Sequence, residues 1–384
     1  MISFELILIG LMLLFGIIYM ILIALYTIGW YRLKSFQPNR NLKLNTRASI
    51  IIPARNEEAN IINLLNDLAF QDVDRDLFEI IVADDQSTDN TVNLVEKFIA
   101  EQSEINIQLI QIQNDSERPT YKKHAISMAI NKSNGDLIIT TDADCRIGPH
   151  WLSGILQFYE QEKPKMIIAP VSFHNENSVF EKMQSLEFLS LIAITGGAIS
   201  IRKPVMCNGA NLTYEKKAFY EAGGFDQDSF ASGDDVFLLL KMMKRFGNNS
   251  IRFLKNLDSI VYTEAQQSIK SFYHQRTRWA SKNKGYNLKI LFVSFSVYFT
   301  NLLMVFGLLY SFFNPAFWGT IITATLIKVI IDIPILVGIT NFVNRNKILL
   351  YAIPLIFFYP FYIVLIGALG IVGSYQWKGR KVIK

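Results

Sequence analysis

Two aspartates separated by one alanine are the residues whose types and spacing point most directly to chemistry. Asp142 and Asp144 close the run Asp136-Leu-Ile-Ile-Thr-Thr-Asp-Ala-Asp, which has the composition of a buried β-strand that reaches its carboxyl end. Residues two apart in a strand point the same way, so both carboxylates can face one site. Oxygen ligands of this kind suit Mg²⁺ or Mn²⁺ carrying a diphosphate, whereas a polar turn is the simpler structural interpretation.

The segment around these aspartates alternates short apolar runs with amphipathic stretches of helical length. This pattern predicts βαβ units and a largely parallel sheet, which binds ligands at the carboxyl ends of its strands. Strands are predicted at residues 49–53, 79–83, 105–111, 137–141 and 166–169, and helices at 57–70, 88–101, 123–131 and 150–160.

Polar clusters follow three of the predicted strands. The first strand runs into Arg55 and Glu57, the second into Asp84 and Asp85, and the fourth into the two aspartates described above. Each cluster alone is explained by a helix cap or an acidic helix N-terminus. Three clusters at one edge of a sheet predict instead a nucleotide pocket with a metal at its phosphate end.

Two further motifs lie downstream. Asp234 and Asp235 open an apolar amphipathic stretch that extends to about residue 246, where Asp234 is either a helix cap or a group of the site. Gln275, Arg278 and Trp279 occur at positions i, i+3 and i+4, so they share one helix face. An arginine there can grip diphosphate oxygens in a bidentate way, and the alternative is a belt at a membrane interface.

The termini have the composition of membrane segments. Residues 1–30 are apolar, and Glu5 is their only formal charge. The segment is long enough to cross a bilayer, and basic residues follow it. By the positive-inside rule these basic residues face the cytoplasm, and with them the body of the protein. The predicted domains are a transmembrane helix (1–31), a basic linker (32–47), a cytosolic domain (48–284) and a C-terminal membrane region (285–384).

The C-terminal region contains three apolar stretches, at residues 290–313, 317–342 and 348–374. Three crossings would leave the final basic residues outside, against the positive-inside trend; these are Lys378, Arg380, Lys381 and Lys384. Pro354 and Pro360 make the last stretch a candidate for a broken, re-entrant helix. A transporter would need intramembrane polar groups, and Lys328 and Asp332, four residues apart, are explained by pairing with each other.

The chain has a formal net charge of +5, and its basic residues cluster near the predicted membrane boundaries. This distribution indicates attraction to anionic lipid head groups rather than binding of nucleic acid. The two cysteines, Cys145 and Cys207, form no disulfide framework and lie in the region predicted to be cytosolic.

Taken in order, these motifs resemble those of the family-2 glycosyltransferases, and the resemblance covers about residues 48–279. It implies an α/β GT-A fold, Rossmann-like and typical of nucleotide-diphospho-sugar transferases, with transmembrane helices at both termini. Arg55, Glu57, Asp84 and Asp85 would then hold a uridine-like base and ribose, with Lys122 near the nucleotide. Asp144 would bind Mg²⁺ or Mn²⁺, and Asp142 would contact the sugar or ribose beside that metal.

The resemblance also assigns the reaction. Asp235 would be the catalytic base of an inverting transfer, with Asp234 as the alternate or a supporting group, because the family's acidic pair is normally Glu-Asp. Gln275, Arg278 and Trp279 would contact the diphosphate and the acceptor. The segment Asn208-Gly-Ala-Asn-Leu-Thr213 and the Gly223-Gly224-Phe225 run resemble the donor-sugar and acceptor region.

We therefore predict an inverting glycosyltransferase that moves a sugar from a nucleotide-diphosphate donor, a UDP-sugar, to a membrane lipid or lipid-linked acceptor. Residues 178–201 are consistent with an amphipathic helix lying on the membrane or with a core helix. The expected location is a bacterial inner membrane with a cytoplasmic catalytic domain. A processive polysaccharide synthase and a non-catalytic scaffold that binds sugar nucleotides stay open as alternatives.

Overall fold

The computed structural model describes residues 4–39, 42–112, 122–225, 233–372, 375–377 and 380–382. The chain divides into two compact units. The α/β unit comprises Leu33–Asn175 and Arg202–Glu264, and the helical unit comprises Met1–Arg32, Glu176–Ile201 and Ala265–Lys384. Lys378 and Lys384, which entered the sequence predictions, lie outside the described residues.

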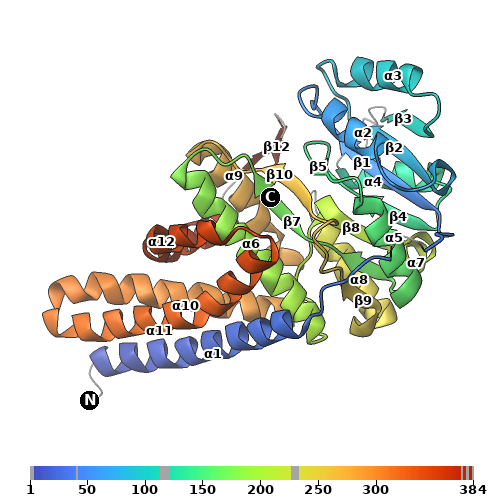
Figure 1. The fold of residues 1–384 in the computed structure, drawn as a ribbon. Coiled ribbons are helices and arrows are strands. Elements are labelled where there is room, and N and C mark those ends of the chain that lie inside the picture. The colour runs from blue at the N-terminus through green and yellow to red at the C-terminus, as the bar shows by residue number, and fades with distance from the viewer. Residues whose placement is uncertain are drawn as a thin grey trace. The chain divides into compact units, whose positions relative to one another are not determined.

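The α/β unit is built on a central sheet with the strand order β3-β2-β1-β4-β8-β6-β9 in its described part (Figure 1). Its strands are β1 (Ala48–Ala54), β2 (Phe78–Asp84), β3 (Ile107–Gln111), β4 (Leu137–Thr140), β6 (Met166–Ile168), β8 (Leu212–Glu215) and β9 (Ile251–Phe253). All run parallel except β8, which is antiparallel to both of its neighbours. The predicted mixed α/β architecture with a largely parallel sheet is confirmed.

The α/β unit also contains a second, smaller sheet, six α-helices in its described part and short 3₁₀ turns. A second sheet has the order β5-β10-β7, with β5 (Arg146–Ile147), β10 (Val261–Glu264) and β7 (Val171–His174). The α-helices are α2 (Ile61–Ala69), α3 (Thr91–Glu101), α4 (Lys122–Lys132), α5 (Trp151–Glu162), α7 (Lys216–Glu221) and α8 (Asp234–Phe246). Short 3₁₀ turns occur at η1 (Arg75–Leu77), η2 (Gly209–Asn211) and η3 (Asn248–Ser250).

The central strands are buried on both faces. Their sequences are therefore continuous hydrophobic runs and do not alternate between apolar and polar residues. Ile50, Ile51 and Ile52 in β1 are fully buried. In the register of β1 with β2, Ala54 lies opposite Asp84, so both strands end at the same level. The loops that follow these strands therefore start side by side at one edge of the sheet.

The helical unit contains the long apolar segments. Its helices are α1 (Phe4–Arg32), α6 (Val179–Ser200), α9 (Ile269–Ala280), α10 (Leu288–Phe313), α11 (Trp318–Phe342) and α12 (Ala352–Val372). Short 3₁₀ turns η4 (Ser281–Gly285), η5 (Pro315–Phe317) and η6 (Asn346–Tyr351) and the hairpin strands β11 (Tyr375–Trp377) and β12 (Arg380–Val382) complete it. Figure 1 shows α1, α10 and α11 side by side along their lengths, and each pair of them is in contact.

Five helices of the described chain are long and apolar enough to cross a membrane: α1, α6, α10, α11 together with η5, and α12 together with η6. Four of these correspond to the apolar stretches predicted from sequence, and α6 is the additional one. It is largely buried, and its buried residues include the polar Gln184 and Glu187 as well as Leu186 and Leu189. This is the burial of a core helix, one of the two interpretations that the sequence left open.

The division by contacts differs from the domain boundaries predicted from sequence. The predicted cytosolic domain, 48–284, contained α6 and α9, whereas both helices pack within the helical unit. Contacts of α6 with α1 and α11, and of α9 with α12, account for this, because these partners are far away in the sequence.

Candidate functional site

Two loops that follow β1 and β2 are held together by reciprocal hydrogen bonds. The backbone N–H of Asn56 donates to Ser87 Oγ at 2.9 Å, and the N–H of Thr88 donates to Asn56 Oδ1 at 2.8 Å. Asn56 and Gln86 both have positive φ, at 52° and 58°, a conformation that asparagine tolerates better than most residues. The two loops form one rigid rim at the edge of the sheet.

The same rim explains why two helices begin later than predicted. Residues 57–60 form a turn in which the Glu57 carbonyl accepts from the N–H groups of Asn60 and Ile61, so α2 starts at Ile61. Asp89 accepts from the Thr91 N–H at 3.0 Å, and α3 starts at Thr91.

Four of the predicted nucleotide-binding residues, Arg55, Glu57, Asp84 and Asp85, belong to this rim. Arg55 donates through Nη1 to the backbone carbonyls of Asp85 and Gln86. Glu57 is buried, its N–H donates to Thr91 Oγ1 at 2.8 Å, and its carboxylate accepts from Asn60 Nδ2 at 3.0 Å. Both residues therefore stabilise the loops that they belong to.

One carboxylate oxygen of Asp84 is buried without a hydrogen-bond partner among the described residues. The residue is 3% exposed, and its Oδ2 accepts from the Ser87 N–H at 3.0 Å. The other oxygen, Oδ1, is buried and accepts no hydrogen bond from the part of the chain that is described. A buried acceptor of this kind calls for a donor, such as a ligand hydroxyl or amide.

A second group of predicted residues meets around the ammonium of Lys122. Lys122 Nζ lies 2.5 Å from Asp142 Oδ1 and 3.7 Å from Asp234 Oδ2. A Cβ built on Gly209 would lie 3.5 Å from Asp234 Oδ2, 3.6 Å from Asp235 Cβ and 3.7 Å from Lys122 Nζ. The start of α4, the loop after β4, η2 and the start of α8 thus converge on one point.

The electrostatics of this group favour a charged lysine. Burial lowers the pKa of Lys122, but the carboxylates of Asp142 and Asp234 outweigh burial and raise its pKa above the ordinary value. Lys122 therefore stays protonated at neutral pH. Burial raises the pKa of the Cys145 thiol, and the charges of Asp144 and Asp142 add to this, so the thiol stays protonated.

The acidic pair does not act as a simple helix cap. The N-cap residue of α8 is Gly233, with φ of 92°, and Asp234 is the first residue of the helix. Its carboxylate faces Lys122 rather than a helix N–H, while Asp235 Oδ1 accepts from the Val236 N–H at 2.8 Å. The two aspartates thus have different surroundings, which the sequence could not distinguish.

The two aspartates of the first motif also have different surroundings. Asp142 is engaged by Lys122, and Asp144 is exposed. Within the ranges that the structure describes, no three His, Cys, Asp or Glu side chains come close enough to hold a metal ion by themselves. Mg²⁺ is usually held by one or two carboxylates together with phosphate oxygens and waters, so the exposed Asp144 fits this mode of binding.

One side chain in this region, Tyr214, was not identified from sequence. Tyr214 is buried, and its hydroxyl has no hydrogen-bond partner among the described residues; burial and the nearby Asp234 raise its pKa. Asn211, part of the predicted donor-sugar segment, is fully buried and instead holds the fold. It accepts from Trp151 Nε1 and donates to the carbonyls of Pro170 and Ser259.

The three predicted residues of α9 lie in the helical unit. Arg278 and Trp279 are half-buried, and Gln275 Oε1 is a buried acceptor without a partner in the described chain. Arg276, within the same motif, is only 2% exposed and was not singled out from sequence. Its guanidinium pairs with Glu187 at 2.5 Å and lies over the Trp279 ring, 4.3 Å from the centroid.

Comparisons with known proteins all find glycosyltransferases. A family model described as Glycosyl transferase family 2 matches residues 49–223, and one described as Glycosyl transferase family group 2 matches residues 137–368. The chain is 26% identical over 288 residues to the probable glycosyltransferase YdaM of Bacillus subtilis, which covers 71% of this chain and 66% of that protein.

Two further relatives are more distant. Beta-monoglucosyldiacylglycerol synthase of Nostoc sp. is 21% identical over 243 residues, or 60% of this chain and 48% of that protein. The chain therefore spans about half to two thirds of these two curated relatives. The mannosyltransferase PcManGT of Pyrobaculum calidifontis, solved with GDP-Man and Mn²⁺, superposes with a TM-score of 0.57 at 17% identity, covering 88% of this chain and 99% of that one. At that identity the likeness concerns the fold alone.

Proposed function

The chain belongs to the family-2 glycosyltransferases, and on this premise we propose that it moves a sugar from a UDP-sugar to a membrane lipid or lipid-linked acceptor. The observation that carries the proposal is the meeting of Lys122, Asp142, Asp234 and Asp235 from separate elements at the edge of the sheet. A lipid acceptor is favoured by the long apolar helices and by the similarity to a diacylglycerol glycolipid synthase.

The donor nucleotide lies along the rim formed by the loops after β1 and β2. The unpartnered Asp84 Oδ1 accepts a hydrogen bond from the base or ribose, while Arg55, Glu57 and Asp85 keep the rim in shape. Asp142 faces the ribose or sugar with its charge balanced by Lys122. Rigid loops of this kind lower the entropy that donor binding costs.

Asp144 would hold Mg²⁺ or Mn²⁺ together with the donor diphosphate, beside Asp142. When bound, the metal supplies charge neutralisation of the leaving diphosphate. Gln275, Arg278 and Trp279 are assigned to the diphosphate and the acceptor, since a guanidinium suits paired phosphate oxygens.

Asp235 takes the proton from the acceptor hydroxyl as that oxygen attacks the anomeric carbon. The new glycosidic C–O bond forms while the bond from the anomeric carbon to the diphosphate oxygen breaks, and the configuration inverts. Asp234 Oδ2 lies 3.7 Å from Lys122 Nζ and forms an ion pair with it. We therefore assign Asp235 as the base and Asp234 as the residue that positions Lys122.

The direct test is release of nucleoside diphosphate by the purified protein in vesicles of membrane lipid extract, with a panel of nucleotide sugars and either Mg²⁺ or Mn²⁺. We expect metal-dependent release and a lipid carrying one added sugar. Asp144→Asn should need at least about tenfold more metal for half-maximal turnover. A ladder of longer products would favour a processive synthase, and donor binding without turnover would favour a scaffold.

We also propose a membrane arrangement, which chain connectivity supports. Both ends of α6 continue into the α/β unit, at Asn175 and Arg202, and a compact unit occupies one side of a membrane. A single crossing by α6 would separate these two ends, so α6 does not cross. We assign the crossings to α1, α10 and α11, with the α/β unit at the cytoplasmic end of α1.

The helix α12 also does not cross in this arrangement, because both of its ends lie beside helices that are connected through the chain to the α/β unit. Before its start, Arg345 Nη2 donates to both carboxylate oxygens of Glu176 at 2.8 Å. Near its end, a Cβ built on Gly370 would come within 2.6 Å of Ala280 Cβ, and β11 then packs against α9. Its exposed apolar face, which would lie in the membrane, consists of Ile353, Phe357, Phe358, Phe361 and Leu365.

This arrangement predicts a cytoplasmic C-terminus, in agreement with the basic residues Arg380 and Lys381 in β12. A green fluorescent protein fused to the C-terminus should fluoresce, and a periplasmic alkaline phosphatase fused there should be inactive. Fusions in the turn between α10 and α11 should give the opposite pair of results. An active phosphatase at the C-terminus would mean that α12 crosses.

A further inference from the structure

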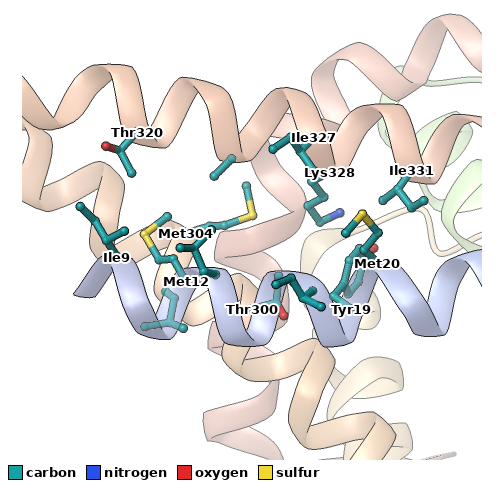
Figure 2. Close-up of a pocket in the computed structure, with 15 residues that line it drawn as sticks. Ile9, Met12, Tyr19, Met20, Thr300, Met304, Thr320, Ile327, Lys328 and Ile331 are labelled. Atoms are coloured by element: carbon teal, nitrogen blue, oxygen red, sulfur yellow. The ribbon is translucent and has the colours of Figure 1, made fainter. Parts of the chain in front are cut away.

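A cavity of about 240 Å³ lies among α1, α10 and α11. Figure 2 shows the side chains of α1 on one side of it and those of α11 on the other, with Thr300 and Met304 contributed by α10. The wall is mainly aliphatic and includes the thioethers of Met12, Met20 and Met304. All three helices belong to the helical unit, and none of the residues assigned to sugar transfer is among those that line the cavity.

The cavity is long rather than round. Its lining residues run from Ile9 to Met20 along α1 and from Thr320 to Ile331 along α11. Each of these stretches covers about 16 Å at 1.5 Å per residue. The slot therefore has the shape of an extended chain lying parallel to the helices.

The polar groups on the wall near the Tyr19 end are already satisfied. Tyr19 donates to Asp332 Oδ1 at 2.7 Å, and Lys328 Nζ donates to Asp332 Oδ2 at 2.5 Å. Thr300 donates to the carbonyls of Phe15 and Ser296. A polar ligand would find few partners here, whereas an apolar cavity of about 150 Å³ already stays dry and binds a hydrocarbon such as benzene.

The slot is accessible from the side of the helices. Leu13 and Ile17 line it, yet they are 61% and 49% exposed. In the membrane arrangement proposed above, this side faces the bilayer, where hydrocarbon chains are the surrounding molecules. We propose that the slot binds one hydrocarbon chain of a membrane lipid, which lies between α1 and α11 with the Lys328–Asp332 pair closing one end.

Two glycines of α1 provide a matched pair of variants. Gly16 lines the slot, and Gly10 does not. A Cβ added at either glycine meets no atom within 4 Å, so neither substitution forces the backbone to move. Gly16→Phe should fill the slot, and Gly10→Phe should place the same ring outside it.

The test uses full-length protein in phosphatidylglycerol vesicles that contain a trace of phosphatidylglycerol with a diazirine in the middle of one acyl chain. After irradiation, adducts are mapped by mass spectrometry of peptides. We expect adducts concentrated at residues 9–20 and 320–331. Labelling there should fall more than about tenfold in Gly16→Phe, because the ring displaces several methylene groups of the chain, and should be unchanged in Gly10→Phe.

Adducts spread evenly over the exposed apolar residues, or equal labelling of both variants, would overturn the proposal. If Gly16→Phe fails to fold, a second pair of variants is available on α11. Ala324→Leu changes a residue that lines the slot, and Leu326→Ile changes an exposed residue as the control. Labelling needs no nucleotide sugar and no turnover. Its outcome is therefore separate from that of the glycosyltransferase assay.

Discussion

Replacing Asp235 by asparagine is expected to lower kcat for sugar transfer by roughly 10²–10⁴-fold, which is the usual contribution of a general base. Asparagine keeps the size of the side chain and can still interact with the first turn of α8, where Asp235 Oδ1 accepts from the Val236 N–H. It cannot accept the proton of the acceptor hydroxyl. Affinity for the nucleotide sugar should stay close to that of the wild type, as measured by isothermal calorimetry beside turnover.

Asp234→Asn is the matched control because it changes the neighbouring residue in the same way. Asp234 Oδ2 lies 3.7 Å from Lys122 Nζ, so its loss weakens the charge balance around the lysine without removing the base. We expect a smaller decrease in kcat and a larger change in the KM for the donor. If Asp234→Asn is inactive while Asp235→Asn retains most of its turnover, the two roles are reversed.

Replacing Arg276 by methionine is expected to destabilise the helical unit by about 3–5 kcal/mol, because it leaves a buried carboxylate without its partner. Glu187 and Arg276 are 6% and 2% exposed, and they join α6 to α9 through a 2.5 Å ion pair. The guanidinium also lies over the rings of Phe272 and Trp279, so a lysine would not replace it fully. Thermal unfolding in detergent micelles should show the loss as a lower Tm.

Arg278→Met provides the comparison two residues away on the same helix. Arg278 is half-buried, and we expect this variant to unfold near the wild-type temperature while losing turnover. The double variant Arg276→Met with Glu187→Gln should regain part of the lost stability, since removing both charges avoids the unpaired one. If Arg276→Met alone unfolds at the wild-type Tm, the ion pair does not hold α9 in place.

Candidate residues for the chemistry could be proposed from sequence because their relative positions depend on local rules. Residues at the ends of parallel strands meet at one edge whatever the details of packing, which is why Asp84 and Asp142 were assigned to one pocket. The i, i+3 and i+4 spacing of Gln275, Arg278 and Trp279 likewise depends only on helix geometry. Helix starts were less predictable, because side chains such as Asp89 bind the backbone and delay α3 to Thr91.

Contacts between distant residues had no comparable local signal. Glu187 and Arg276 are 89 residues apart, and Gly209 reaches Lys122 and the acidic pair from a separate part of the chain. Composition identified an apolar helix at α12 but could not separate crossing a membrane from lying in it, because both require the same apolar face. The sequence thus determined the fold class and the enzyme family, and it supplied candidate residues for the reaction. Tertiary packing decided which carboxylates meet Lys122, since burial and charge pairing exist only once distant segments meet.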